Sequence, residues 1–457
     1  MSLMRNALLG NSNVHVEAAQ LSTEEVDFNM TVAMEEYSEI VTISEELKRM
    51  EDVAPALEGL AEVCDAIDEP TIAHKALVES AAELALAGTG IKPAEMVPSL
   101  ESHDDATIST EGIKEIAVSI YESIRDMVKK LWKKVKDFFY RMFGAVPSLR
   151  RAAQKLKAKA EDKASGHTDE NKITLGSEAN VLSVNYKLKT SPKDIKEGLA
   201  NIGSLCNDML DTYTKGLGKI GMDIASAIGD YEAESDVASL KKINDTIVGM
   251  GSQTAGLEKL VKESAKKDPR MKDAVNPMRL DLLGNKSIFM HFPDKSKDFA
   301  SNLAAATDAN DKARISEQYR GRAYQSWRID IMSSSVKSKD ALEDGEIDIL
   351  MPADCIEMAD EILAICDAIE GFTGGKGIKD LEKARDKLDS AASKASKAVS
   401  KADDLTSDQT TSWRVAAGYA NAWSRWATQP HGAIQATAMA ACRAALVAAN
   451  KSLSKFK

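Results

Sequence analysis

The sequence lacks the features that define several common classes of protein. No run of about 18 consecutive apolar residues occurs, so we expect no transmembrane helix. Residues 1–10 lack the apolar core of a secretory signal. Aromatic residues make up only 5% of the 457 residues, and proline contributes only 11. Ala, Lys, Glu, Ser and Leu are abundant instead, and this composition favours helices.

Cysteine and histidine are also sparse, and neither forms a recognisable reactive group. The five cysteines are isolated in the sequence: Cys64, Cys206, Cys355, Cys366 and Cys442. We expect reduced thiols in a protein made in the cytoplasm, with Cys366 and Cys442 as core residues. The six histidines lie apart, and neither HExxH nor GxSxG occurs. The sequence predicts no enzyme, no metal site, no cofactor and no small-molecule substrate, although an enzyme without a recognisable motif is an alternative.

Three short segments invite comparison with functional motifs, but none of them fits a motif. Residues 371–377 are one residue short of a P-loop, and Gly377 stands where Ser or Thr would hold Mg²⁺. Residues 308–313 begin like a calcium-binding loop but carry Lys312 and Ala313 at ligand and glycine positions. Residues 343–346 are acidic but are more typical of a solvated turn. We predict a turn between helices for the first segment.

Hydrophobic periodicity predicts a mainly α protein with a small antiparallel β element. Four regions differ in composition: an acidic helical segment with a linker (1–111), basic amphipathic helices (112–165), a mixed α+β body (166–352) and a C-terminal helical bundle (353–457). Helices are expected over 194–228, 356–370, 378–405, 412–427 and 432–456. Short strands are expected at 173–175 and 181–184, and those at 287–292, 327–332 and 347–350 could form one small sheet.

The region 112–144 has the strongest amphipathic pattern of the chain. Apolar residues recur at three- and four-residue steps, the opposite face is basic, and Pro147 separates a second basic helix. Core packing, contact with an anionic membrane and contact with DNA phosphates all fit this pattern. The candidate contact residues are Arg125, Lys129, Lys130, Trp132, Lys133, Lys134, Lys136, Phe138, Phe139 and Arg141.

The charge of the chain reverses at the start of this helix. Residues 1–111 contain 23 acidic and 5 basic residues, a net charge of −18, whereas 112–457 contain 48 and 54, a net charge of +6. Residues 112–163 alone carry +8. The whole-chain value of −12 therefore hides a basic body behind an acidic segment. Such an order is typical of a removable propiece that masks a basic surface.

Ser109, Thr110, Glu111 and Gly112 lie at this reversal, and the residues around them resemble a processed phage protein. The stretch from IKEIAVSIYESIRDMVKKLWKKVKDFFYRMFG to LRRAAQKLKAKA is similar to the Lys/aromatic helix that follows cleavage sites in internal head proteins of giant phiKZ-like tailed phages. In that family a prohead protease cuts after Glu in Ser/Ala/Gly-X-Glu. Tripeptides ending at Glu24, Glu35, Glu101 and Glu370 also match, so position at the charge reversal distinguishes Glu111.

The resemblance implies a non-enzymatic structural protein of the virion. It would be made in the host cytoplasm, packaged in the capsid interior with DNA and other internal head proteins, trimmed after Glu111 by the prohead protease, and ejected with the DNA. The alternative is a membrane-active effector that its acidic N-terminal domain masks. A permanent acidic domain over residues 1–111 is the simplest contrary interpretation.

Overall fold

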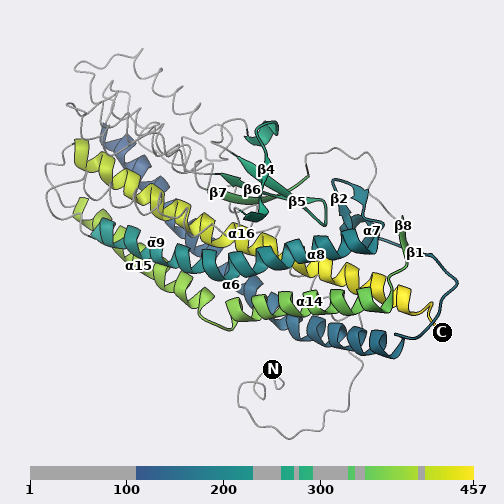
Figure 1. Ribbon diagram of the computed structural model, residues 1–457. Helices are drawn as coiled ribbons and strands as arrows, with labels where there is room; N and C mark the ends of the chain where they lie inside the picture. Colours follow the sequence, from purple (N-terminus) through teal and green to yellow (C-terminus); the bar gives the residue numbers. More distant parts are fainter. Residues whose placement is uncertain (1–109, 230–258, 272–276, 292–327, 335–344, 400–406) are drawn as a thin grey trace, which may run out of the picture.

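The computed structural model of the protein describes residues 110–229, 259–271, 277–291, 328–334, 345–399 and 407–457 (Figure 1). The acidic segment up to residue 109 and residues 308–313 therefore lie outside the described residues.

Long helices form four parallel and antiparallel rows (Figure 1). The helices are α6 (Thr110–Asp162), α8 (Pro192–Asn207), α9 (Thr214–Gly229), α14 (Pro352–Thr373), α15 (Gly377–Val399) and α16 (Ser407–Leu453). A π-helical turn, η1 (Asp208–Tyr213), joins α8 to α9 without a loop. The α8–α9 row and the α14–α15 row run opposite to α6 and α16 (Figure 1).

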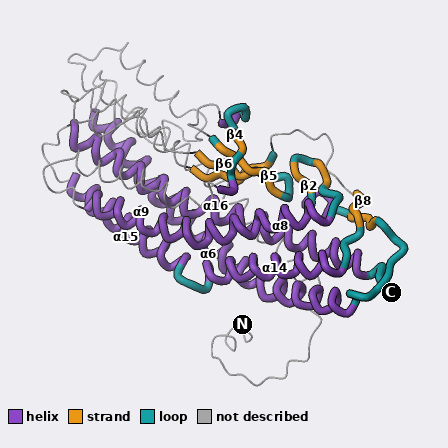
Figure 2. The backbone as a smooth tube through the Cα atoms, viewed as in Figure 1, coloured by secondary structure: helices purple, strands orange, loops and turns teal. Residues whose placement is uncertain are grey.

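Short strands make three small antiparallel sheets beside the helices (Figure 2). The strands are β1 (Lys172–Leu175), β2 (Ser183–Val184), β3 (Lys187–Leu188), β4 (Glu263–Ser264), β5 (Met278–Leu282), β6 (Lys286–His291), β7 (Arg328–Ser333) and β8 (Gly345–Asp348). Two short helices, α7 (Glu178–Val181) and η4 (Pro269–Met271), complete the described elements. Strands β4, β5, β6 and β7 form the largest sheet in that order. The predicted fold class, mainly α with a small antiparallel β element, is confirmed.

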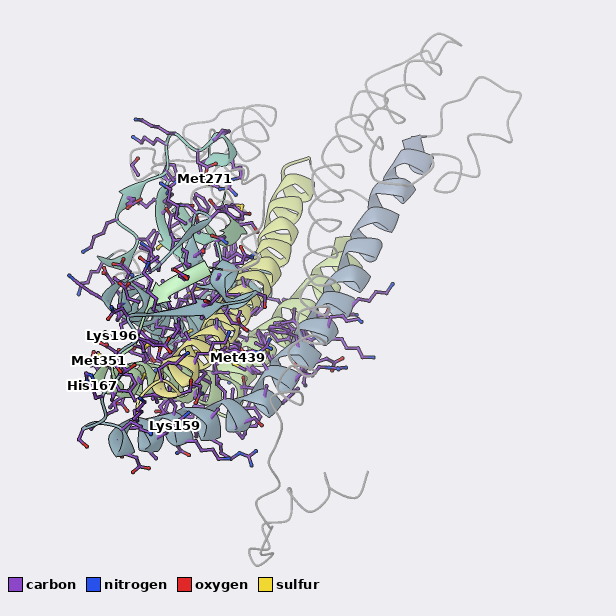
Figure 3. All side chains as sticks on the ribbon, turned by 90° about the vertical axis from the view of Figure 1, so that its right-hand side faces the viewer. Lys159, His167, Lys196, Met271, Met351 and Met439 are labelled. Atoms are coloured by element: carbon purple, nitrogen blue, oxygen red, sulfur yellow. The ribbon has the colours of Figure 1, made fainter. Side chains whose placement is uncertain are left out.

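The helix rows share one hydrophobic core. Side chains of α6, α8, α9, α14, α15 and α16 belong to a single buried cluster, which also includes residues of β1, β6 and β8. Met439 lies among the side chains enclosed by the helices (Figure 3) and is 1% exposed. Described residues of 112–165, 166–352 and 353–457 all contribute to this core.

Small residues let three of the rows approach closely. A Cβ atom at Gly221 of α9 would lie 2.8 Å from Cβ of Ala384 in α15 and 2.8 Å from the Trp423 ring of α16. The indole Nε1–H of Trp423 donates a hydrogen bond to the Leu217 carbonyl at 2.8 Å. A larger residue at 221 would have to displace a buried ring, so this crossing depends on glycine.

Two predicted helix breaks are wrong. We expected Pro147 to separate two helices, but α6 continues through it to Asp162. We also expected separate helices on either side of Pro430, but α16 runs unbroken from Ser407 to Leu453. A proline removes one backbone hydrogen bond, and burial of the apolar residues on both sides outweighs that loss.

The predicted β runs form strands, but not one sheet. Strands β6 and β7 pair as expected over Lys286–His291. β8 instead pairs with β1, and Ile173 lies opposite Ile347. Both isoleucines are buried, because this pair closes the end of the bundle where α14 begins. Sequence periodicity carries no information about which strand is the partner.

The second half of α16 is an apolar helical segment. The segment Pro430–Leu453 is long and apolar enough to cross a membrane, with a mean hydropathy of 1.3. However, 83% of its most apolar window is buried inside the protein. In this structure the segment is a core helix, and its apolar side chains contact the other rows.

Candidate functional site

The predicted cleavage site coincides with the start of α6. Thr110, Glu111 and Gly112 belong to its first turn, while Ser109 lies outside the described residues. The first turn of a helix lacks intrahelical partners for its N–H groups and opens more readily than the interior. A protease would therefore have to unwind one terminal turn to reach the Glu111–Gly112 bond.

The aromatic members of the predicted contact set are core residues. Trp132 is 5% exposed, Phe138 0% and Phe139 1%. The Phe139 ring meets Phe372 of α14 edge-on, with 5.0 Å between ring centres. Spacings of three and four residues bring these rings to one helix face, and that face points into the bundle. The structure thus places the three rings in the protein's own hydrophobic core.

Basic residues on the flanks of α6 pair with acidic residues of α15. The Lys136 Nζ atom lies 2.5 Å from a Glu382 carboxylate oxygen, and Lys129 lies 3.8 Å from Asp389. The hydrogen bond to Glu382 raises the Lys136 pKa above its usual value. Both pairs connect α15 to the part of α6 that precedes Pro147.

Further along α6, basic residues pair with α14 instead. The Arg150 guanidinium contacts Asp367 at 2.5 Å and Glu370 at 2.8 Å, and Lys157 contacts Asp360 at 2.7 Å. Hydrogen bonds to Asp367 and Glu370 raise the Arg150 pKa. These ion pairs neutralise part of the basic surface that the sequence predicted.

Another set of basic residues points away from the bundle. Lys130, Lys133, Arg151 and Lys155 are exposed, and none of them has an ion pair with a described residue. Among the described residues, Arg151 donates only to the Pro147 carbonyl on its own helix, at 3.2 Å. From Lys130 to Lys155 this outer basic face spans about 38 Å at 1.5 Å per residue.

The remaining members of the predicted set differ in their surroundings. Lys134 is partly buried and Arg141 exposed, and each has an interaction partner. Arg125 belongs to α6. The outer basic face includes Arg151 and Lys155, which the predicted set omitted.

The other motifs take structural roles where they are described. Residues 371–377 end α14 and begin α15, so the P-loop-like segment is a turn between helices as predicted. Gly345 and Glu346 of the acidic run belong to β8. No cluster of three potential metal ligands occurs among the described residues. Cys366 and Cys442 are buried, and burial raises the pKa of the Cys366 thiol to about 12.

Sequence reasoning missed the acidic partners of α6 and one buried histidine. Asp360, Asp367, Glu370, Glu382 and Asp389 lie more than 200 residues from the bases they contact. The sequence shows that these acidic residues recur on the polar faces of two predicted helices. It does not show that basic residues of α6 are their partners. His431 is 0% exposed. Its apolar neighbours in an Ala-rich helix were the one sequence feature that could have predicted its burial.

Taken together, the described residues define a mainly helical protein whose basic surface helix begins at a candidate processing site. The chain belongs to the phiKZ-like phage internal head proteins, whose family profile matches residues 20–451. It is therefore a structural protein of the phage head interior. Comparisons with curated proteins and with solved structures found no match.

Proposed function

We infer that this internal head protein is packaged with the phage DNA and matured by removal of residues 1–111. The observation that carries the proposal is the coincidence of three features at one point. A Ser-X-Glu tripeptide, the reversal from −18 to +6 and the first turn of the basic helix α6 all fall at Glu111. The prohead protease is the proposed processing partner.

Electrostatics gives a reason for trimming inside a DNA-filled head. Duplex DNA carries one negative charge per about 1.7 Å of its axis, so a segment of charge −18 is repelled by packaged DNA. The remaining body of charge +6 is attracted. The uncut chain suits synthesis and assembly, and the trimmed chain suits contact with DNA and with other internal head proteins.

The outer basic face of α6 is the proposed DNA-contacting surface. Its four residues, Lys130, Lys133, Arg151 and Lys155, are exposed and lie along one continuous helix. Contacts between such side chains and phosphates need no base readout, which suits packaged DNA of any sequence. Burial of Trp132, Phe138 and Phe139 speaks against the alternative of a membrane-active helix, because membrane binding needs an exposed apolar face.

The cleavage site is tested on protein purified from phage particles. We expect a mature N-terminus at Gly112, measured by intact mass and N-terminal sequencing. Glu111→Gln should leave the propiece attached, because the protease requires the carboxylate. Glu101→Gln, in the neighbouring Ser-X-Glu tripeptide, is the matched control and should be processed normally. A mature N-terminus elsewhere, or normal processing of Glu111→Gln, would contradict the proposal.

DNA contact is tested by the salt dependence of binding to duplex DNA. The logarithm of the binding constant falls with the logarithm of salt by about 0.9 per phosphate contacted. Changing Lys130, Lys133, Arg151 and Lys155 to Gln should reduce this slope by about 3 to 4. The control changes four other exposed lysines, Lys193, Lys262, Lys379 and Lys383, to Gln. Equal slopes for the two variants would reject the outer basic face as the contact surface.

A further inference from the structure

A band of interacting side chains crosses the middle of the bundle. We define the central layer as Phe139 of α6, Tyr213 and Thr214 at the η1–α9 junction, Phe372 of α14 and His431 of α16. The ring of His431 stacks on Phe372, with 5.3 Å between ring centres, and lies 5.5 Å from Tyr213. Phe139 meets Phe372 from the other side. The layer therefore touches all four helix rows.

Each row departs from a regular α-helix at or near this level, two of them at a proline inside a continuous helix. Pro147 lies two turns beyond Phe139 in α6, and Pro430 precedes His431 in α16. The α8–α9 row contains the π-helical turn that ends at Tyr213. The α14–α15 row breaks at residues 374–376, directly after Thr373. Prolines and π-helical turns are the usual places where helices bend.

Hydroxyl groups of the layer donate to backbone carbonyls beside two of these irregularities. Pro430 has no N–H for the Trp426 carbonyl, and the Tyr213 hydroxyl donates to that carbonyl at a long 3.4 Å. The Thr214 hydroxyl donates to the Met209 carbonyl at 2.9 Å. Its single proton is then used, so Nε2–H of His431 donates to the Thr214 oxygen at 2.9 Å. With Nε2–H as the donor, Nδ1 of His431 has no hydrogen-bond partner among the described residues.

Within the part of the chain that the structure describes, the layer and its neighbours contain buried polar atoms with no hydrogen-bond partner. They are Nδ1 of His431, both amide atoms of Gln435 one turn further along α16, and Oγ1 of Thr373. His431 and Gln435 are 0% exposed and Thr373 is 7% exposed. Unsatisfied polar groups destabilise the straight bundle, whereas a bend that admitted water would satisfy them.

The parts on either side of the layer have their own internal connections. On one side, α8 and α14 pack together and ion pairs from Arg150 and Lys157 join α14 to α6. On the other side, α9 packs on α15, and Lys129 and Lys136 join α15 to α6. Each half-bundle therefore has interhelical contacts of its own.

We propose that the central layer is a hinge at which the two half-bundles of this protein bend relative to each other. Irregularities near one level of all four rows lower the resistance to bending there. The aromatic rings of the layer slide past one another, while each half-bundle moves as a rigid body. The inference does not depend on cleavage at Glu111 or on DNA contact.

The hinge is tested by electron–electron distance measurements on the full chain with Cys64→Ser and spin labels at introduced cysteines. Four exposed lysines supply the positions: Lys155 and Lys193 in one half-bundle, Lys133 and Lys219 in the other. The four described native cysteines are buried and do not compete for label.

Pairs across the layer, 133–155 and 193–219, should give distance distributions at least twice as broad as the pairs 155–193 and 133–219 within one half. Widths that are the same for both kinds of pair would overturn the proposal. Replacing Thr373 by Val and both His431 and Gln435 by Leu should narrow the cross-layer distributions, because no buried polar atom then gains from water.

A second measurement needs no variant of the layer. Hydrogen exchange of the unlabelled chain should be faster for peptides covering 209–214, 371–377 and 426–435 than for peptides on both sides, such as 217–225 and 358–366. Uniform or slower exchange at the layer would equally overturn the hinge.

Discussion

Burial determines the chemistry of individual side chains in this protein. His431 lies among apolar groups of three helix rows, and burial lowers its pKa from 6.5 to about 3. Its only described hydrogen bond joins Nε2 to Thr214. A proton on Nδ1 would have no acceptor there, so the folded protein holds the neutral ring.

This burial predicts acid sensitivity. Because the pKa is lower in the folded state, the unfolded chain binds the proton more tightly, and stability falls as pH drops below about 6.5. The contribution of His431 is about 1.4 kcal/mol per pH unit, hence about 2 kcal/mol between pH 7.5 and pH 5. Urea unfolding at both pH values measures it.

Comparison of variants isolates the contribution of His431 from that of the carboxylates. His431→Gln should lose less stability on acidification than the parent chain by about the same 2 kcal/mol. His167, which is largely exposed beside Asp169, supplies the control. His167→Gln should show the same pH dependence of the free energy of unfolding as the parent chain. If His431→Gln shows it too, the buried ring does not cause the loss of stability in acid.

Among the elements, α6 shows how far periodicity alone reaches. Most of the predicted apolar positions whose side chains are described are buried, including Trp132 and Phe138, whereas Phe143 is 37% exposed. The sequence could not say whether that face meets the protein or a membrane, because both environments select the same residues. Nor could it show that α6 continues beyond Pro147, since continuation depends on the packing of Leu149 and Ala153 against other helices.

The continuity of α6 makes a prediction about Pro147. The proline is exposed inside a helix, where proline is less favourable than alanine by up to about 3 kcal/mol. Pro147→Ala should therefore raise the free energy of unfolding by about 1 to 3 kcal/mol, measured by urea denaturation.

Pro192 provides the matched comparison. It occupies the first turn of α8, where proline fits the helix and the missing N–H has no intrahelical partner. Pro192→Ala should leave stability unchanged or slightly lowered. Equal gains from both substitutions would mean that the position of the proline within the helix is irrelevant.

At the scale of the whole molecule, charge changes sign between the two proposed forms. The uncut chain carries −12 and the chain from residue 112 carries +6. We expect the mature protein from particles to bind duplex DNA at least roughly tenfold more tightly than the uncut chain at about 0.1 M salt. Fluorescence anisotropy measures both forms under the same conditions.

High salt provides the control for this electrostatic difference. The screening length shrinks to about 3 Å at 1 M salt, so the two forms should then bind with similar weakness. A difference that persisted at 1 M salt would point to a cause other than charge, such as a segment that covers the outer basic face.

The sequence by itself determined the fold class, the amphipathic character of α6 and the charge reversal at Glu111, because composition and periodicity are local properties of the chain. Only the tertiary structure decided which bases of α6 are neutralised by α14 and α15 and which remain on the outer basic face. It alone brought Tyr213, Phe372 and His431 together in the central layer. Such pairings join residues up to 260 positions apart, and a pattern within one segment does not specify the segment that packs against it.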